Sequence, residues 1–178
     1  MKKLLLVTGL MVASLATYAQ GTLNFANFVT VPPPGTSVNA PIFNIDGTTL
    51  LAGSQFQAIL YGGINASSLV AIAPSVAFLT GAGAGYFIGG QRIVPNVPGN
   101  TIGVLQVRAW DSLSGATWDT ATIRGQSPLL TTLSLGQAPA TPPNMVGLQS
   151  FSLVPVPEPS TIALAILGAA GLFLRRRK

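Results

Sequence analysis

The sequence of 178 residues contains no cysteine and no histidine. Without cysteine the chain has no disulfide, no thiolate nucleophile and no thiol to which an N-terminal lipid would be attached. Without histidine as well, it lacks the usual zinc ligands and the commonest general base. We therefore expect no metal site and no cofactor, and attachment to a membrane would need a hydrophobic segment.

Charge is scarce too, at 7% of the chain, and most of it lies at the two ends. Lys2 and Lys3 open the sequence, residues 175–178 read RRRK, and together with Glu158 these account for the net charge of +5. Between residues 20 and 157, three arginines balance three aspartates: Arg92, Arg108, Arg124, Asp46, Asp111 and Asp119. A neutral body does not attract polyanions over distance, so we expect no nucleic-acid partner.

Residues 1–19 have the order of features that is typical of a secretory signal peptide. Two lysines precede an apolar stretch over residues 4–16, and small residues follow at Thr17 and Ala19. We predict cleavage by signal peptidase between Ala19 and Gln20, and thus an exported protein that uses the secretion machinery. A short buried helix is the alternative, but it would leave two lysines beside an apolar run.

A second apolar stretch, residues 161–174, contains no charge and is followed by Arg175, Arg176, Arg177 and Lys178. As a helix it would span about 21 Å, less than the ~30 Å hydrocarbon core, so its length also suits a core helix. However, Pro159 and Ser160 suit a helix start, and arginine side chains that reach the headgroups help a short segment to span. We predict a transmembrane helix with the basic residues in the cytoplasm and the body outside.

The order of these features resembles a known family. Val156, Pro157, Glu158, Pro159 and Ser160, then the apolar stretch, then RRRK, are similar to the PEP-CTERM sorting signal of diderm bacteria. The resemblance implies that the tail is held transiently in the inner membrane and that an exosortase-type membrane protease recognises Pro157, Glu158 and Pro159. Processing would then deliver the protein to the cell envelope, surface or extracellular matrix. The alternative is a proline linker with an incidental glutamate.

Between these ends the pattern is that of short strands. Phe56, Ala58 and Leu60 alternate with Gln55, Gln57, Ile59 and Tyr61, and Leu105, Val107 and Ala109 alternate with Val104, Gln106, Arg108 and Trp110. Further strands are expected at residues 22–28, 75–80, 85–90 and 148–154. We predict an all-β chain with a single β-sandwich, jelly-roll or Ig-like, over residues 20–154, followed by the sorting signal over 155–178.

Turns and loops are expected at several glycine- and proline-rich segments. Asp46 and Gly47 predict a turn, and residues 109–125 predict a hairpin with a turn from Asp111 to Gly115 and a return strand over 116–123. Residues 138–145 predict a loop. Residues 81–90 are glycine-rich but lack the lysine of a phosphate-binding loop, so a flexible loop or a tightly turned hairpin is expected there.

The body offers little acid–base chemistry. Of its three acids, Asp111 suits a turn cap, and Asp119 suits an ion pair with Arg108 or Arg124. A hydrolase based on these aspartates is a weak alternative, since no catalytic motif is present. Calcium binding by Asp46, Asp111 and Asp119 lacks the dense oxygen spacing of a dedicated loop. We expect no enzyme activity.

The aromatic residues suggest a binding function as the main alternative. Trp110, Trp118 and Tyr61 would form a platform for a sugar, because aromatic rings offer an apolar face with a polar edge. Cross-strand packing explains the same residues without a ligand. The leading interpretation is thus an exported, non-catalytic surface or matrix protein, and the alternative is a carbohydrate-binding module associated with exopolysaccharide.

Overall fold

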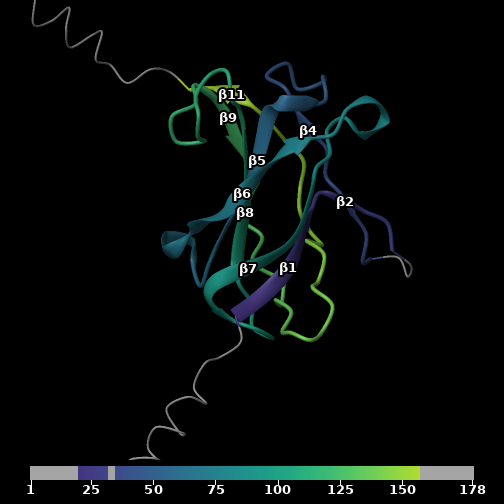
Figure 1. The fold of residues 1–178 in the computed structure, drawn as a ribbon, viewed down its shortest axis with the longest axis vertical. Coiled ribbons are helices and arrows are strands. Elements are labelled where there is room, and N and C mark those ends of the chain that lie inside the picture. The colour runs from purple at the N-terminus through teal and green to yellow at the C-terminus, as the bar shows by residue number, and fades with distance from the viewer. Residues whose placement is uncertain (1–19, 32–34, 157–178) are drawn as a thin grey trace, which may run out of the picture.

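The computed structural model describes residues 20–31 and 35–156 (Figure 1). Its strands are β1 (Gln20–Ala26), β2 (Phe28–Val29), β3 (Val38–Asn39), β4 (Ile42–Phe43), β5 (Gly53–Gly63), β6 (Val70–Phe78), β7 (Ile88–Pro98), β8 (Val104–Asp111), β9 (Ile123–Gln126), β10 (Phe151–Ser152) and β11 (Val154–Pro155). Two short 3-10 helices, η2 (Ala66–Ser68) and η3 (Gly81–Gly83), complete the described elements. The predicted all-β class is confirmed.

Both predicted helices, at residues 1–19 and 161–174, lie outside the described residues. Among the residues that are described, no helix has the length and apolar character needed to span a membrane. The signal peptide and the transmembrane helix therefore stay predictions.

The largest sheet has five strands in the order β11-β9-β8-β5-β6, and every pairing in it is antiparallel. Central strands β5 and β8 pair along their length, from Phe56 opposite Asp111 to Gly63 opposite Val104. Both predicted alternations are confirmed, because the inner face is buried along Ala58, Leu60, Leu105, Val107 and Ala109. The outer face carries Tyr61 and Arg108.

A second layer is built from shorter pairings. β1 pairs antiparallel with β7, and the other side of β1 is bonded to the segment after β9: the Thr22 amide donates to the Gly136 carbonyl oxygen at 2.9 Å, and the Asn24 amide to that of Pro143 at 2.8 Å. β10 pairs with β4 in parallel, and β2 with β3 antiparallel. The jelly-roll or Ig-like sandwich topology stays a prediction.

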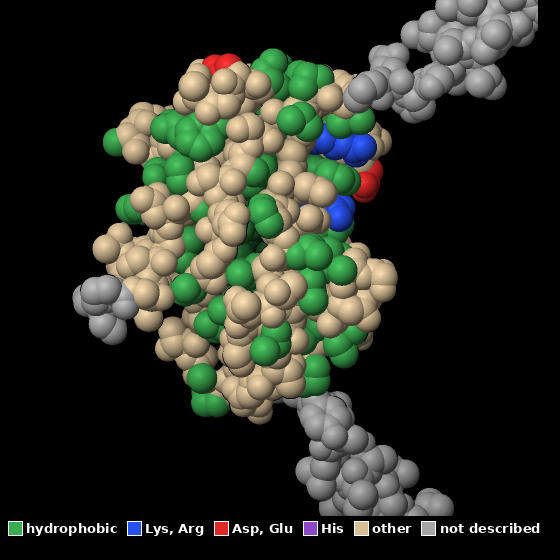
Figure 2. Space-filling model, turned by 180° about the vertical axis from the view of Figure 1, so that it is seen from behind, with side chains coloured by type: hydrophobic (Ala, Val, Ile, Leu, Met, Phe, Trp, Pro, Cys, Tyr) green, Lys and Arg blue, Asp and Glu red, His purple; other side chains and the backbone are tan. Residues whose placement is uncertain are grey.

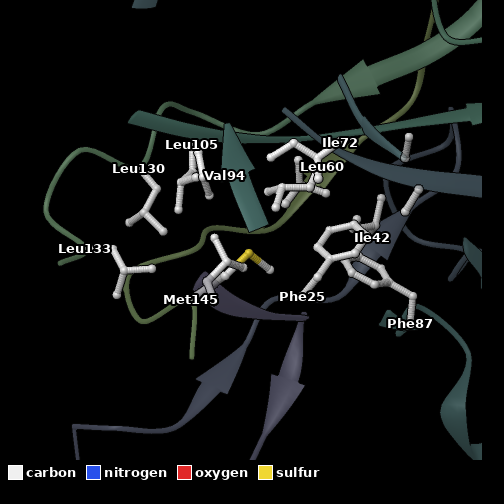
Figure 3. Packing of buried hydrophobic residues seen from close by; sticks show 14 of the residues in the cluster. Phe25, Ile42, Leu60, Ile72, Phe87, Val94, Leu105, Leu130, Leu133 and Met145 are labelled. Carbon is white, nitrogen blue, oxygen red and sulfur yellow. The ribbon is translucent and has the colours of Figure 1, made fainter. Parts of the chain in front are cut away.

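The hydrophobic core lies between these layers (Figure 3). The rings of Phe25 from β1 and Phe87 meet at a centroid distance of 4.6 Å, and Leu60 of β5 is fully buried with them. The loop predicted at 138–145 is present, and its last residue, Met145, is fully buried. Segments without regular strands thus complete the core beside the five-stranded sheet.

Four further predictions concern the turn at Gly47, the glycine-rich segment and two strands. Gly47 has a φ of +71° and its amide donates to the Asn44 carbonyl oxygen at 2.9 Å, which confirms the turn there. The glycine-rich segment forms the tight turn η3 between β6 and β7. The strand expected at 85–90 begins only at Ile88, and the one expected at 148–154 is split into β10 and β11.

The predicted return strand over residues 116–123 is wrong. β8 ends at Asp111 and β9 begins only at Ile123, so residues 112–122 form a loop. Within it, the amides of Thr120 and Ala121 both donate to the Thr117 carbonyl oxygen, at 3.2 and 2.9 Å. These local bonds turn the backbone where the alternating sequence had favoured an extended strand.

Candidate functional site

The three aromatic residues singled out in the sequence lie around one groove on the outer face of the five-stranded sheet. The groove has a volume of about 270 Å³, and its lining includes Tyr61, Trp110, Trp118, Ala71, Ser75 and Asp119. Strands β5, β6 and β8 supply its floor, and loop 112–122 supplies one wall. The structure therefore brings the predicted platform residues together.

Loop 112–122 is held over the sheet by hydrogen bonds at its base. The Asp111 carboxylate accepts from the Leu113 amide at 2.9 Å, which confirms the turn-capping role predicted for Asp111. The Ser114 hydroxyl donates to the Asp111 carbonyl oxygen at 2.8 Å and accepts from the Ile123 amide at 3.0 Å. These bonds tie the end of β8 to the start of β9, so the residues between them fold back.

Trp110 lies beneath this loop. It is opposite Arg124 on β9 and Gln57 on β5, and only 4% of its surface is exposed. Its indole Nε1 is buried and has no hydrogen-bond partner among the described residues. Trp110 thus contributes to the groove from below instead of standing on the surface as a free platform.

Two arginines lie against the other aromatic side chains, Arg108 between the two rings and Arg124 on Trp118 alone. The Arg108 guanidinium lies 3.7 Å from the centroid of the Tyr61 ring and 4.2 Å from that of Trp118, and Arg124 lies 4.3 Å from the Trp118 centroid. The two rings themselves are 6.4 Å apart and inclined at 60°. We call Tyr61, Arg108, Trp118 and Arg124 the arginine–aromatic stack. Cations over ring faces at these distances attract the ring quadrupole.

Hydrogen bonds fix the stack in place. The Trp118 indole Nε1 donates to the Gly125 carbonyl oxygen at 3.0 Å. Arg124 Nη1 donates to the main-chain oxygens of Trp118 and Asp119, at 2.6 and 2.8 Å. Arg108 Nε donates to the Gln106 side-chain oxygen at 2.9 Å. The Trp118 side chain and the Arg124 guanidinium therefore add to the bonds at the base of loop 112–122 in holding it against the sheet.

The stack changes what the aromatic residues can offer a sugar. Guanidinium groups cover part of the ring surface of Tyr61 and Trp118, so a sugar could stack only on what they leave free. The sugar platform stays a prediction. Sequence reasoning did not assign Arg108 and Arg124 to this site. The signal was present in the alternation of β8, which puts Arg108 on the same face as Trp110.

The aspartates do not form a reactive cluster. Asp111 is buried, and its carboxylate also accepts a hydrogen bond from the Gln55 side-chain Nε2 at 3.1 Å. The predicted ion pair of Asp119 with Arg108 or Arg124 is absent from the described part of the chain, where Arg124 binds the main-chain oxygen of Asp119 instead. Across residues 20–31 and 35–156, no group of three or more histidine, cysteine or acidic residues is suited to a metal ion.

The hydrogen bonds of its own turn lower the pKa of the Asp46 carboxyl group. Its side chain accepts from the Thr49 hydroxyl at 2.5 Å and from the amides of Thr48 and Thr49 at 3.0 and 2.9 Å. These bonds, with the Thr49 hydroxyl first, lower the pKa of Asp46 from 3.8 to about 2. Because they all lie within one turn, they explain Asp46 as a turn residue.

The described chain ends in the sheet next to the stack. Val154 of β11 is opposite Arg124, and the Val156 amide donates to the Thr122 carbonyl oxygen at 2.7 Å. Gln20, at the predicted cleavage site, is the first residue of β1 and lies opposite Pro98. The other residues predicted to act in sorting, topology and cleavage lie outside the described residues: Pro157, Glu158, Pro159, Arg175, Arg176, Arg177, Lys178 and Ala19.

Comparison with known proteins identifies this last part of the chain. No curated protein and no solved structure matches the sequence. Residues 155–178 match a family model described as the PEP-CTERM protein-sorting motif, and the match begins at Pro155, inside β11. The resemblance seen in the sequence from Val156 onward is confirmed. The protein carries a PEP-CTERM protein-sorting motif attached directly to an all-β body.

Proposed function

We propose that the protein is an exported, non-catalytic component of the cell envelope or extracellular matrix that is delivered through an exosortase. In this account the signal peptide directs export, residues 161–174 hold the chain in the inner membrane, and an exosortase-type protease recognises Pro157, Glu158 and Pro159. The observation that carries the proposal is the match of residues 155–178 to the sorting motif.

The fold supports such a separation of roles. The hydrophobic core is completed by Leu153, and the last described main-chain bond is made by Val156. Removal of residues 161–178 would therefore leave every described core residue in place. The non-catalytic role is supported by the aspartates, since Asp111 is buried in a turn cap and Asp46 belongs to a separate turn.

Substitution of the motif glutamate in the native host tests the proposal. We expect the wild-type chain at the cell surface or in the matrix, without residues 161–178. The Glu158→Gln chain should instead accumulate at full length in the inner membrane, because the single charge of the recognition segment is lost. Asp119→Asn, the same chemical change in the body, is the control and should be processed normally. Equal processing of the Glu158→Gln chain would overturn the assigned recognition.

Carbohydrate binding is the second candidate, and the groove lined by Tyr61 and Trp118 favours it. Aromatic rings offer a sugar an apolar face with a polar edge. Retention of the protein in gels that contain the host's exopolysaccharide tests this function. Tyr61→Ala should abolish retention, whereas Tyr86→Ala, an aromatic deletion away from the groove, should not. Unchanged retention of Tyr61→Ala would exclude the groove.

A further inference from the structure

The short connection between the folded body and the apolar run limits where the body can sit. Residues 157–160 separate Val156 from Thr161, and this link spans at most about 18 Å whatever its conformation. The headgroup region on each side of the hydrocarbon core is roughly 5–8 Å thick. If residues 161–174 enter a bilayer, as in the proposed function, the surface of the body around β11 must lie at or near the headgroups.

The arginine–aromatic stack lies at this surface. Arg124 is the cross-strand partner of Val154, so one strand spacing of about 4.8 Å separates it from β11. Arg108 is on the next strand, β8, and Trp118 bridges the two guanidinium groups. In Figure 2 the basic side chains gather along one flank of the molecule. The stack is thus close to the point where the described chain ends.

The guanidinium groups retain free hydrogen-bond donors. No described residue accepts a hydrogen bond from Arg108 Nη1, Arg108 Nη2 or Arg124 Nη2. These atoms are also not among the buried atoms without a partner, which include nitrogens of Arg92 and Trp110. They are therefore open to solvent and can bind phosphate oxygens. The structure places these two cations around one ring. Of the two acids nearby, Asp111 is buried at the base of loop 112–122, where its carboxylate accepts from the Leu113 amide, and Asp119 is exposed on the loop.

The remaining chemistry of the surface is that of a membrane interface. Tryptophan and tyrosine are enriched at the headgroup level because their rings are amphipathic. Val154 is 54% exposed beside Arg124, and Leu113 on loop 112–122 is 80% exposed. Apolar side chains next to arginines suit a surface that is anionic outside and apolar below.

We propose that the arginine–aromatic stack binds the anionic headgroups of the membrane that holds residues 161–174. This inference rests on the proposed function, because it needs the tail to enter the bilayer. The contact orients the body before processing, with the outer face of the five-stranded sheet near β11 turned toward the lipid. After the tail is removed, only these headgroup contacts hold the body at the membrane.

The full chain, reconstituted into vesicles, tests the inference by hydrogen exchange. Vesicles of phosphatidylcholine are compared with vesicles of an equimolar mixture of phosphatidylcholine and phosphatidylglycerol. We expect amides of loop 112–122 to exchange more slowly on the mixed vesicles. Arg108→Gln and Arg124→Gln should each reduce this lipid-dependent protection about fivefold. Asp119→Asn should increase it, since the substitution removes the acid of the same loop without touching the stack.

Arg92→Gln is the matched control, because it makes the same charge change on β7 in the other layer, and it should leave the protection unchanged. Exchange of the β5 and β8 amides checks that each variant is folded. Equal protection on both kinds of vesicle, for a chain that floats with them, would overturn the inference and leave the proposed function intact. A chain that does not float with vesicles would contradict the membrane step of the proposed function. Protection by soluble polyuronate but not by lipid would overturn the inference in favour of an acidic polysaccharide.

Discussion

The Val156 amide donates to the Thr122 carbonyl oxygen at 2.7 Å, so the folded body continues to the residue immediately before Pro157. A protease that binds an extended substrate needs several residues free of the fold. Pro155, the second residue of the edge strand β11, is therefore part of both the sheet and the matched sorting motif. The stability of this junction should influence how the sorting motif is presented.

Gly125→Ala should weaken the junction. A Cβ atom at this position would lie 2.5 Å from the Ser152 carbonyl oxygen and 3.2 Å from the Leu153 Cα, both in the backbone of the neighbouring segment. Because that segment must move away, we expect a loss of about 1–3 kcal/mol in the free energy of unfolding, measured with urea. Faster exchange of the Val156 amide should accompany it. The adjacent Gln126→Ala, at an exposed side chain, should change stability by less than about 0.5 kcal/mol. Equal effects would contradict the close approach.

Asn27→Ala should be strongly destabilising. The buried Asn27 amide nitrogen donates to the carbonyl oxygens of Ala40 and Gly85 at 2.8 and 2.9 Å, and its oxygen accepts from the Phe87 amide at 2.7 Å. Three main-chain groups would lose a hydrogen bond, although the Gly85 oxygen keeps its bond from the Ile42 amide, and we expect a cost of about 2–4 kcal/mol in urea unfolding. Asn39→Ala, which removes an exposed amide bonded to Tyr86, should cost less than about 1 kcal/mol. A small effect at Asn27 would show that water replaces its bonds.

A double-mutant cycle between Arg108 and Trp118 should detect direct coupling. The guanidinium lies 4.2 Å from the ring centroid, and cation–π pairs of this kind contribute about 0.5–1 kcal/mol. Unfolding of four proteins gives the coupling energy: the wild type, the single variants Arg108→Gln and Trp118→Leu, and the double variant. A cycle between Arg92 and Trp118 serves as the control and should give none. Zero coupling for Arg108 would mean that the stack is held only by the hydrogen bonds of the loop.

Asp46 should titrate with a pKa of about 2, measured by NMR of its carboxyl carbon. Its folded pKa is lower than the ordinary value of 3.8, so its turn bonds stabilise the fold above about pH 4 and are lost as the pH falls toward 2. Asp46→Asn should remove this part of the acid dependence, while Asp119→Asn should leave it in place. A pKa near 3.8 would show that the turn bonds do not persist in solution.

The sequence predicted the strands whose periodicity is strongest. In β5 and β8 the side chains alternate between the two faces as expected, and one face of each strand lies on the core. On the outer face of β8, Gln106 and Trp110 are buried as well. The pairing of β1 with β7 was not predictable, since nothing local in either segment marks a partner so distant along the chain. The Met145 loop was predicted as a loop, but its contribution to the core depends on that same distant pairing.

The candidate site was also predicted only in part, because some of its contacts depend on the tertiary structure. Alternation placed Arg108 and Trp110 on one face, and the structure brings Tyr61 and Trp118 to the same groove. The prediction of a return strand over 116–123 was wrong, because local bonds to Thr117 and the contacts of Trp118 with two guanidinium groups outweigh strand propensity. The sorting motif was recognisable because its order of proline, glutamate, apolar run and arginines is linear and needs no tertiary contact.

The intact mass of the protein recovered from the envelope of its native host tests export and processing most directly. The proposed function predicts a chain that begins at Gln20 and ends within or close to residues 155–160, because both the signal peptide and residues 161–178 are removed. A mass that includes residues 161–178, or an intact chain found in the cytosol, would contradict it.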